Sequence, residues 1–512
     1  MKNCCTFAGV FLKKNACLTN TTNLVKKIII SILILAADLI FCSDVQHHQN
    51  ISNDNYVSSD LDSIRERGKL IAITDFNSTN YFVYKGEPMG FHYELLKAFT
   101  DHLGVNMEII TENNLDNAFK LLKSGKADLL AFGLTVNSSR KKEILFTDPI
   151  VQTRQVLVQR KPFYWRSLTS DELNKLLIRN QLDLAGKTIF VQTNSSHYER
   201  LMSLSAEIGE NINVVEVAWE AEELIRNVAK GEIEYAVCDE NVARVNSTYY
   251  SEIDIRTPVS FPQNIAWGLR KDNSQTLLNE LNSWISTYKT SRSYALLYAK
   301  YFRNSRSSLM VKSDYYSLNT GKISRWDDLI KSASIDIDWD WRLLASLIYQ
   351  ESRFIPNVQS RAGAYGLMQV MPLTAKKLGI NIKASPASNI RAGTMYINWL
   401  QSVFEPLIPD ENERMKFILA SYNAGPGHVL DAMKLAEKNG KDPQKWDGNV
   451  AVWLLKKSDP VYYKDIVVRS GYFRGTESVN FVSEVLERYE HYRNIVPEDG
   501  SNRLTMNTVR NI

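Results

Sequence analysis

The sequence DWDWRLLASLIYQES, residues 338–352, predicts a helix with one apolar face. Leu344, Leu347, Ile348 and Glu351 recur at i, i+3, i+4 and i+7, which places them on one side of a helix with 3.6 residues per turn. A carboxylate at the end of an apolar stripe is unusual. Loss of water there would raise the pKa of Glu351 and keep it protonated near neutral pH, as a general acid requires. A surface glutamate at a helix end is the alternative, and the helix alone does not decide between them.

Two later motifs favour the catalytic interpretation. ESRFIP at 351–356 is followed by SRAGAYGLMQVMPLTA at 360–375 and by SYNAG at 421–425. In this order and spacing, the set resembles the domain of soluble lytic transglycosylases, which is related to goose-type lysozyme. The resemblance covers residues 326–494 and implies a mainly α, lysozyme-like fold.

The resemblance implies that Glu351 is the sole catalytic acid and base. It would protonate the glycosidic oxygen between N-acetylmuramic acid and N-acetylglucosamine, and then take the proton of the muramoyl C6 hydroxyl, which closes a 1,6-anhydro ring. Because this nucleophile belongs to the substrate, no second carboxylate is needed, unlike in paired-acid glycosidases. No second acid lies within residues 352–375.

The same resemblance assigns substrate contacts to four polar residues: Ser352, Gln369, Tyr422 and Asn423. Met368 and Met371 are interpreted as packing residues. The sequence departs from the family pattern where Ser421 replaces alanine and Phe481 replaces tyrosine. The missing phenol hydroxyl predicts a changed rate rather than a changed reaction.

Residues 60–303 alternate between short apolar runs and helical segments. Strands are expected at 69–74, 107–110 and 127–132, and helices at 93–102 and 115–124. This alternation predicts an α/β architecture with mostly parallel sheets, in which ligands sit beyond the carboxyl ends of the strands.

An ordered series of motifs gives this segment its family resemblance: GFHYELL (90–96), GKADLL (125–130), GLTVNSSR (133–140), FTDP (146–149) and GEIEYAVCD (231–239). Together they resemble the family 3 extracellular solute-binding proteins, the bilobed proteins of periplasmic binding-protein type. The resemblance implies that one lobe is formed by 60–153 and 258–303, the other by the residues between, and that a ligand is clamped between them.

The ligand residues follow from the same resemblance. Arg140 would pair with a ligand carboxylate, for which its planar fork is suited, and Thr135 would add a hydroxyl. Ser195 or Ser196 would close from the second lobe, and Asp239 would receive the ammonium group. The alternative for Arg140, which precedes two lysines, is a solvated charge run. The expected ligand is a cell-wall peptide or an amino acid.

The cysteines gather at the front of the chain. Cys4, Cys5, Cys17 and Cys42 precede a remainder that holds only Cys238, so a disulfide framework and a CxxC metal site are excluded. Cys238 is interpreted as a packing residue in an apolar run. We expect no metal and no cofactor.

An export segment precedes the folded domains. Two lysines and the apolar run 28–41 fit a secretory signal, since the run is shorter than the roughly 20 residues that span a bilayer. LIFC at 39–42 resembles a bacterial lipobox, although Phe41 stands where a small residue is usual, and implies lipidation of Cys42. An uncleaved signal anchor is the alternative.

The expected organisation is a signal segment (1–42), a tether (43–59), the solute-binding-like domain (60–303), a linker (304–325), the transglycosylase-like domain (326–494) and a polar tail (495–512). For 512 residues, a net charge of +4 is too small to indicate nucleic acid. The combined domains resemble the family of membrane-bound lytic murein transglycosylases F. This implies a peptidoglycan-cleaving enzyme in the periplasm, attached to the inner face of the outer membrane.

Two alternatives stay open at this point. The first is an exported solute receptor whose second domain is inactive and only anchors it to the wall. The second is hydrolysis by water, as in goose-type lysozyme.

Overall fold

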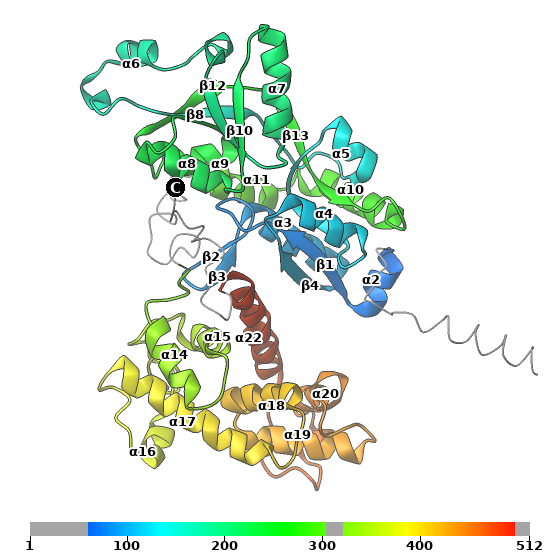
Figure 1. The fold of residues 1–512 in the computed structure, drawn as a ribbon. Helices are drawn as coiled ribbons and strands as arrows, with labels where there is room; N and C mark the ends of the chain where they lie inside the picture. Colours follow the sequence, from blue (N-terminus) through cyan, green and yellow to red (C-terminus); the bar gives the residue numbers. More distant parts are fainter. Residues whose placement is uncertain (1–59, 304–320, 497–512) are drawn as a thin grey trace, which may run out of the picture. The chain divides into compact units, whose positions relative to one another are not determined.

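The computed structural model describes residues 60–303 and 321–496 (Figure 1). The expected signal segment with Cys42, the tether, most of the linker and the tail lie outside the described residues. Within the two described ranges, no helix is both long enough and apolar enough to cross a membrane.

The first domain, residues 60–303, contains two large sheets. One has the strand order β4 (Asn106–Thr111), β1 (Lys69–Thr74), β5 (Leu129–Thr135), β13 (Gln263–Leu269) and β6 (Leu145–Phe146), and β7 (Val151–Thr153) also pairs with β13. The other has the order β10 (Asn213–Val217), β9 (Thr188–Gln192), β11 (Tyr235–Asp239), β8 (Gln155–Arg160) and β12 (Ile253–Pro258). The α/β fold class and the three predicted strands are therefore confirmed.

The expectation of mostly parallel sheets is wrong. Strand β1 runs parallel to β4 and β5, but β13 is antiparallel to β5, and β8 is antiparallel to both β11 and β12. The chain passes from one sheet to the other between β7 and β8 and returns between β12 and β13. In each sheet the strand that follows a crossing, β8 or β13, runs against the direction of the parallel core.

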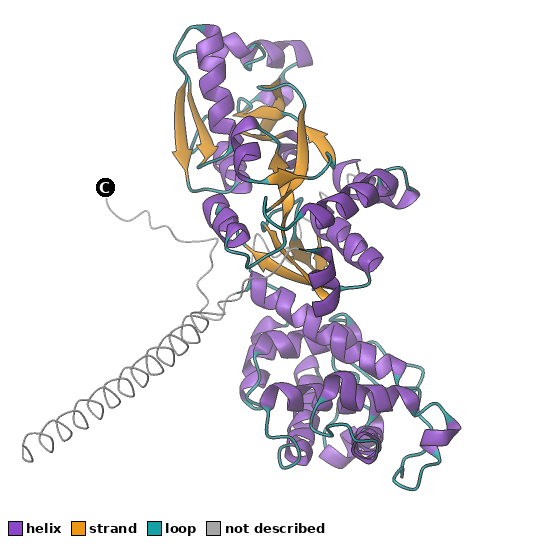
Figure 2. Cartoon of the chain, turned by 90° about the vertical axis from the view of Figure 1, so that its right-hand side faces the viewer, coloured by secondary structure: helices purple, strands orange, loops and turns teal. Residues whose placement is uncertain are grey.

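Helices cover both sheets, as Figure 2 shows. The first sheet carries α3 (Phe91–Leu103), α4 (Leu115–Lys123) and α10 (Gln275–Tyr288), and the second carries α7 (Ser196–Ile208), α8 (Ala221–Lys230) and α9 (Glu240–Ser247). The remaining helices of this domain are α2 (Leu61–Arg67), α5 (Ser138–Glu143), α6 (Ser170–Leu176) and α11 (Arg292–Tyr298). Each sheet has its own apolar core, which fixes the strand ends where ligand residues are expected.

The second domain, residues 321–496, is helical. Its helices are α14 (Asp327–Ile335), α15 (Trp341–Ser352), α16 (Pro372–Leu378), α17 (Pro386–Phe404), α18 (Glu411–Ala424), α19 (Pro426–Lys438), α20 (Ala451–Lys456), α21 (Pro460–Tyr463) and α22 (Thr476–Ile495). Helix α15 confirms the predicted helix and packs against α14 and α22. Leu344, Leu347 and Ile348 are fully buried, and so is Leu343, because neighbours cover more of α15 than one face.

A hairpin of the first domain contacts α15 and α22. It consists of β2 (Phe82–Tyr84) and β3 (Glu87–Met89), joined at Lys85 and Gly86. Tyr349 of α15 donates a hydrogen bond to the Glu87 carboxylate, and Tyr492 Oη of α22 donates to Gly86 O at 2.8 Å. Gly86 has φ +85°, and a Cβ there would lie 2.5 Å from the Tyr349 ring, so this contact requires glycine.

Candidate active site and ligand-binding cleft

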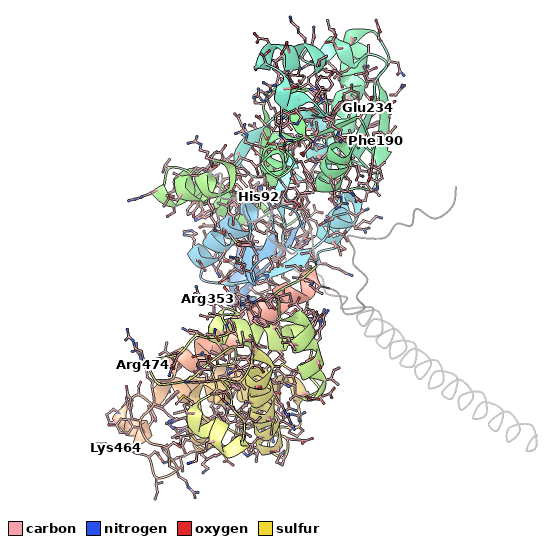
Figure 3. All side chains as sticks on the ribbon, turned by 90° about the vertical axis from the view of Figure 1, so that its left-hand side faces the viewer. His92, Phe190, Glu234, Arg353, Lys464 and Arg474 are labelled. Atoms are coloured by element: carbon pink, nitrogen blue, oxygen red, sulfur yellow. The ribbon has the colours of Figure 1, made fainter. Side chains whose placement is uncertain are left out.

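Glu351 lies in the last turn of the buried helix α15. Burial raises the pKa of its carboxyl to about 8, and the negative charge of Glu477 adds to this effect. Arg353 and Phe354 follow with φ of 51° and 62°, so the chain leaves the helix directly behind the acid (Figure 3 labels Arg353). Glu351 therefore holds its proton at neutral pH, as a general acid must.

Glu477 is an acid of this site that was not among the sequence-based candidates, since it lies about 100 residues beyond the segment 352–375. It stands in the first turn of α22 and is exposed to solvent. The motif ESVNFV at 477–482 was the sequence signal that could have found it. The two carboxylates interact electrostatically and belong to the same site.

Tyr422 also belongs to the surroundings of Glu351. Its side chain is half-buried, and loss of water around the phenol together with the charge of Glu351 raises the pKa of Tyr422. Its Oη donates to Met368 O at 2.8 Å, which joins α18 to the loop before α16. The ring of Tyr396 in α17, absent from the sequence-based candidates, lies 5.4 Å from the Tyr422 ring, and Trp399 stacks on Tyr396 at 5.6 Å.

Asn423 is held by the start of α22. Its Oδ1 accepts a hydrogen bond from Ser478 Oγ at 2.5 Å, and Ser478 is fully buried. The neighbouring Ser421 is fully buried as well, and its Oγ has no partner within the described residues. The hydroxyl of Ser421 thus contributes no contact that alanine would lose.

The amide of Gln369 supports a loop instead of offering its donors to the acid. Its Nε2 donates to Val358 O at 3.1 Å and to Gly366 O at 2.8 Å. Asn389, which sequence reasoning missed, braces the same loop: its Nδ2 donates to Tyr365 O at 2.8 Å and its Oδ1 accepts from Met368 N at 2.9 Å. In this conformation both amide hydrogens of Gln369 are used inside the loop, and its contact with substrate or acid stays a prediction.

The remaining candidates of this domain divide into buried and exposed residues. Ser352 is buried, and its Oγ donates to Ile348 O one turn back at 3.1 Å. Met368 is fully buried, which confirms its packing role, whereas Met371 is 39% exposed. The packing prediction is wrong for Met371 because it precedes α16 as the N-cap residue, outside the core. Phe481 is buried among apolar side chains.

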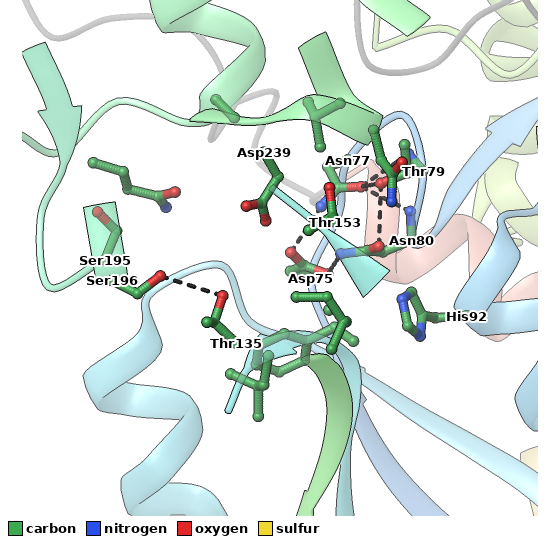
Figure 4. Close-up of a pocket in the computed structure, with 18 of the residues that line it drawn as sticks. Asp75, Asn77, Thr79, Asn80, His92, Thr135, Thr153, Ser195, Ser196 and Asp239 are labelled. Atoms are coloured by element: carbon green, nitrogen blue, oxygen red, sulfur yellow. Dashed lines mark hydrogen bonds between the residues drawn. The ribbon is translucent and has the colours of Figure 1, made fainter. Parts of the chain in front are cut away.

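The predicted ligand residues of the first domain gather around one cavity, of which Figure 4 gives a close-up. Thr135, Arg140, Ser195, Ser196 and Asp239 all line it. Ser196 Oγ donates to Thr135 Oγ1 at 3.2 Å, a contact between the two sheets' ends. The cavity has a volume of about 110 Å³.

Arg140 behaves differently from the two lysines that follow it. Lys141 and Lys142 are exposed, whereas Arg140 is half-buried and donates through Nη1 to Thr135 O at 3.2 Å. Burial lowers the pKa of Arg140, and the nearby acids, Asp239 among them, oppose that effect. The structure thus separates Arg140 from the solvated charge run.

Several cavity residues were not found from the sequence, among them Asp75, Asn80 and His92, which lie on one side of the cavity in Figure 4. His92 accepts from Trp267 Nε1 at Nδ1 (2.9 Å), and burial lowers its pKa to about 3, so it is neutral. Cys238 is buried, which agrees with a packing role. In residues 60–303 and 321–496, no cluster of His, Cys, Asp or Glu has the arrangement of a metal site.

Comparison with known families matches both domains. Residues 70–304 match the model of bacterial extracellular solute-binding proteins, family 3, and residues 328–445 match the transglycosylase SLT domain. A solved structure of the ancestral amino acid-binding protein AncCDT-1, a precursor of cyclohexadienyl dehydratase, aligns with 48% of this chain and 99% of its own at 25% identity and a TM-score of 0.40.

Curated relatives span both domains. A membrane-bound lytic murein transglycosylase F of Desulfosudis oleivorans is 34% identical over 429 residues, covering 83% of this chain and 90% of the relative. One from Pseudomonas fluorescens strain Pf-5 is 30% identical over 438 residues, covering 84% and 86%. The chain belongs to the membrane-bound lytic murein transglycosylase F family, and it is a lyase that acts on peptidoglycan.

Proposed function

We propose that this enzyme cleaves the β-1,4 bond between N-acetylmuramic acid and N-acetylglucosamine and releases 1,6-anhydro-muramoyl products. The observation that carries this proposal is the half-buried Glu351 at the end of α15, whose pKa is raised to about 8. A carboxyl that stays protonated at neutral pH can donate to a glycosidic oxygen.

Two proton transfers complete the reaction. The Glu351 carboxyl gives its proton to the glycosidic oxygen as the bond from that oxygen to C1 breaks. The resulting carboxylate then takes the proton of the muramoyl C6 hydroxyl, whose oxygen attacks C1. Glu351 ends in its starting state and no water is consumed.

The neighbouring polar residues have supporting roles in this proposal. Tyr422 and Asn423 contact the substrate and help to place Glu351, while Ser352 and Gln369 hold the helix end and the loop around it. Their hydrogen bonds to Met368, Ser478, Ile348 and Val358 support such a positioning function.

Mass spectrometry of the muropeptides released from purified wall tests the reaction. We expect anhydro products, about 18 Da lighter than hydrolysed ones because one water is missing, and no release by Glu351→Gln. Reducing ends alone would instead establish hydrolysis, for which the nearby carboxylate of Glu477 is the one specific observation. Equal release by Glu351→Gln and wild type would leave only the wall-anchoring interpretation.

We further propose that the first domain is a ligand sensor. Residues from both of its sheets line one cavity, and its hairpin β2–β3 contacts the catalytic helix through Glu87 and Tyr349. A ligand can change the activity of the second domain only if the protein has two arrangements of this Glu87–Tyr349 contact and the ligand binds one of them more tightly than the other. Wall-cleavage rates measured with and without a bound ligand, in wild type and in Arg140→Ala, test this role.

Export to the periplasm and attachment to the outer membrane through Cys42 complete the proposal. Metabolic labelling with a fatty acid tests the anchor: label that is lost in Cys42→Ser supports lipidation, whereas unlabelled protein that still sediments with membranes favours the signal anchor.

A further inference from the structure

A basic and aromatic loop leaves the second sheet of the first domain. The connection from β8 to β9 carries α6, which lies at the margin of that sheet in Figure 1. The connection starts from the sequence RKPFYWR at 160–166, which contains three cationic side chains, three aromatic side chains and no acid. We call residues 160–166 the basic-aromatic loop. None of its residues lines the cavity between the two sheets.

Two aromatic side chains of the basic-aromatic loop project into solvent. Phe163 is 92% exposed and Tyr164 is 44% exposed. Their rings meet edge to face, with centroids 5.0 Å apart. A phenyl ring with this exposure gains almost nothing from the fold, whereas its transfer from water to an apolar medium would be favourable. The pair therefore presents apolar surface for a partner outside the domain.

Cationic groups surround the third ring of the loop. Lys161 Nζ lies 4.3 Å from the centroid of the Trp165 ring, and Arg166 Cζ lies 4.9 Å from it. Attraction between the cations and the face of the ring keeps both charges beside the exposed aromatic pair. Arg160, at the end of β8, is exposed as well. Positive charge and apolar surface thus occur together on one short segment.

The neighbouring acids leave the loop positively charged. Lys161 Nζ donates to Ser251 O at 2.9 Å, and Arg166 Nη2 donates to Ser251 Oγ at 3.2 Å, both uncharged acceptors. The pKa of Glu252 is lowered by its own backbone amide and, to a smaller extent, by the charges of Arg166 and Lys161. Asp254, the other acid that acts on Lys161, is already paired with two other arginines. One acid, Glu252, is therefore left for these two cations.

This combination fits the surface of a lipid bilayer. Aromatic rings enter the headgroup region of a bilayer, and lysine and arginine side chains are attracted to anionic lipids. A ring exposed on nearly all sides suits a fluid apolar phase, whereas protein partners are packed against shaped surfaces. The family of this chain is membrane-bound, so a bilayer is a surface that the protein meets.

We propose that the basic-aromatic loop docks on an anionic lipid bilayer, with Phe163 and Tyr164 in the headgroup region and the three cations against lipid phosphates. This contact goes beyond the proposed anchor at Cys42, because it belongs to the folded first domain. A membrane anchor would raise the local concentration of lipid, so that even a weak contact orients the domain on the bilayer.

Hydrogen-exchange mass spectrometry on the full chain tests the proposal, because it measures the loop separately from any anchor. The amides of residues 163–168 lie at a single helical turn, Trp165–Ser167. We expect vesicles of equal parts phosphatidylglycerol and phosphatidylcholine to slow their exchange roughly tenfold, since the cations and the exposed rings both favour binding. Vesicles of phosphatidylcholine alone should have little effect, and high salt should weaken the protection. Equal exchange with and without the anionic vesicles would overturn the proposal.

Variants identify the groups that make the contact. Phe163→Ser should remove most of the protection, and Lys161→Gln with Arg166→Gln should remove its dependence on anionic lipid. Phe261→Ser is the matched control, because Phe261 is 86% exposed in the same domain but residues 257–264 carry no charge. Full protection in Phe163→Ser, with a thermal midpoint equal to that of wild type, would overturn the assignment, and so would an equal loss in Phe261→Ser.

Purified wall distinguishes the bilayer from another partner and from the proposed function. Protection of the loop by lipid-free wall, without protection by anionic vesicles, would overturn the proposal and make the wall the partner. Phe163→Ser should release muropeptides from soluble wall fragments at the wild-type rate, because the loop is not part of the surroundings of Glu351. Failure of the bilayer contact would therefore leave the transglycosylase proposal standing, and failure of anhydro release would leave the bilayer contact standing.

Discussion

Ser478 Oγ lies 2.5 Å from Asn423 Oδ1 and donates a hydrogen bond to it. This bond joins the end of α18 to the first turn of α22, the turn that also carries Glu477. The charge of Glu477 in turn raises the pKa of Glu351 at the end of α15. Helix α22 therefore contributes to the electrostatics of Glu351 through Glu477 and holds Asn423 at the end of α18 through Ser478.

Removal of the Ser478 hydroxyl should slow catalysis. In Ser478→Ala, Asn423 loses a partner in a partly buried site, and a net hydrogen bond of about 1 kcal/mol predicts a roughly fivefold to tenfold fall in kcat with KM nearly unchanged. Steady-state release of muropeptides measures both constants. Ser483→Ala is the control on the same helix, since Ser483 is exposed and donates only to Val479 O at 3.3 Å. A fall of equal size in both variants would contradict a role of the Ser478 bond.

The pH dependence of cleavage should follow Glu351. Its carboxyl must be protonated to act as acid, so the rate should fall as pH rises through about 8. Glu477→Gln removes a negative neighbour, which makes ionisation of Glu351 easier and should move this alkaline limb to lower pH. The pH profile of kcat/KM measures the shift. A limb that moves to higher pH would exclude Glu477 as a repelling neighbour.

Glu351 should also lower the stability of the fold at neutral pH. The unfolded chain releases this proton near the ordinary glutamate value of 4.5, whereas the folded chain keeps it until about 8. Between those values the unfolded state binds fewer protons, so the free energy of unfolding falls as pH rises. Because one pKa unit corresponds to about 1.4 kcal/mol, Glu351→Gln should gain ~1–4 kcal/mol over wild type between pH 5 and 8. Urea unfolding at pH 5 and pH 8 measures this difference. If the difference between Glu351→Gln and wild type were the same at both pH values, the raised pKa of Glu351 would be refuted.

Gly366 should resist substitution more strongly than its neighbour Gly363. Both have positive φ, 84° and 92°, but a Cβ on Gly366 would lie 2.3 Å from Asn389 Nδ2, whereas Gly363 has no atom within 4 Å of that position. Gly363→Ala should cost about 1 kcal/mol for backbone strain, and Gly366→Ala about 2–4 kcal/mol because it also displaces Asn389. Thermal unfolding compares them, and equal losses would show that Asn389 moves freely.

The local pattern of the chain was sufficient for much of the fold. Helix α15 and the strands β1 and β4 follow from apolar periodicity, because the burial of one face imposes that period on the sequence. Strand β5 continues to Thr135, beyond the predicted end at 132, because Thr135 pairs with Ile265 of β13. Such pairing joins residues far apart in the chain, and no local pattern contains it.

The sequence by itself determined the two domains' classes. It also predicted Glu351 as the acid and the set Thr135, Arg140, Ser195, Ser196 and Asp239, which the structure brings to one cavity. Only the tertiary structure decided the direction of the sheets, the use of the Gln369 amide inside its own loop, and the approach of Glu477 and Asp75 to their sites. The physical reason is range. Helix and strand patterns act over a few residues, whereas the pKa of a buried carboxyl depends on every charge and on all the water that folding brings near it or removes.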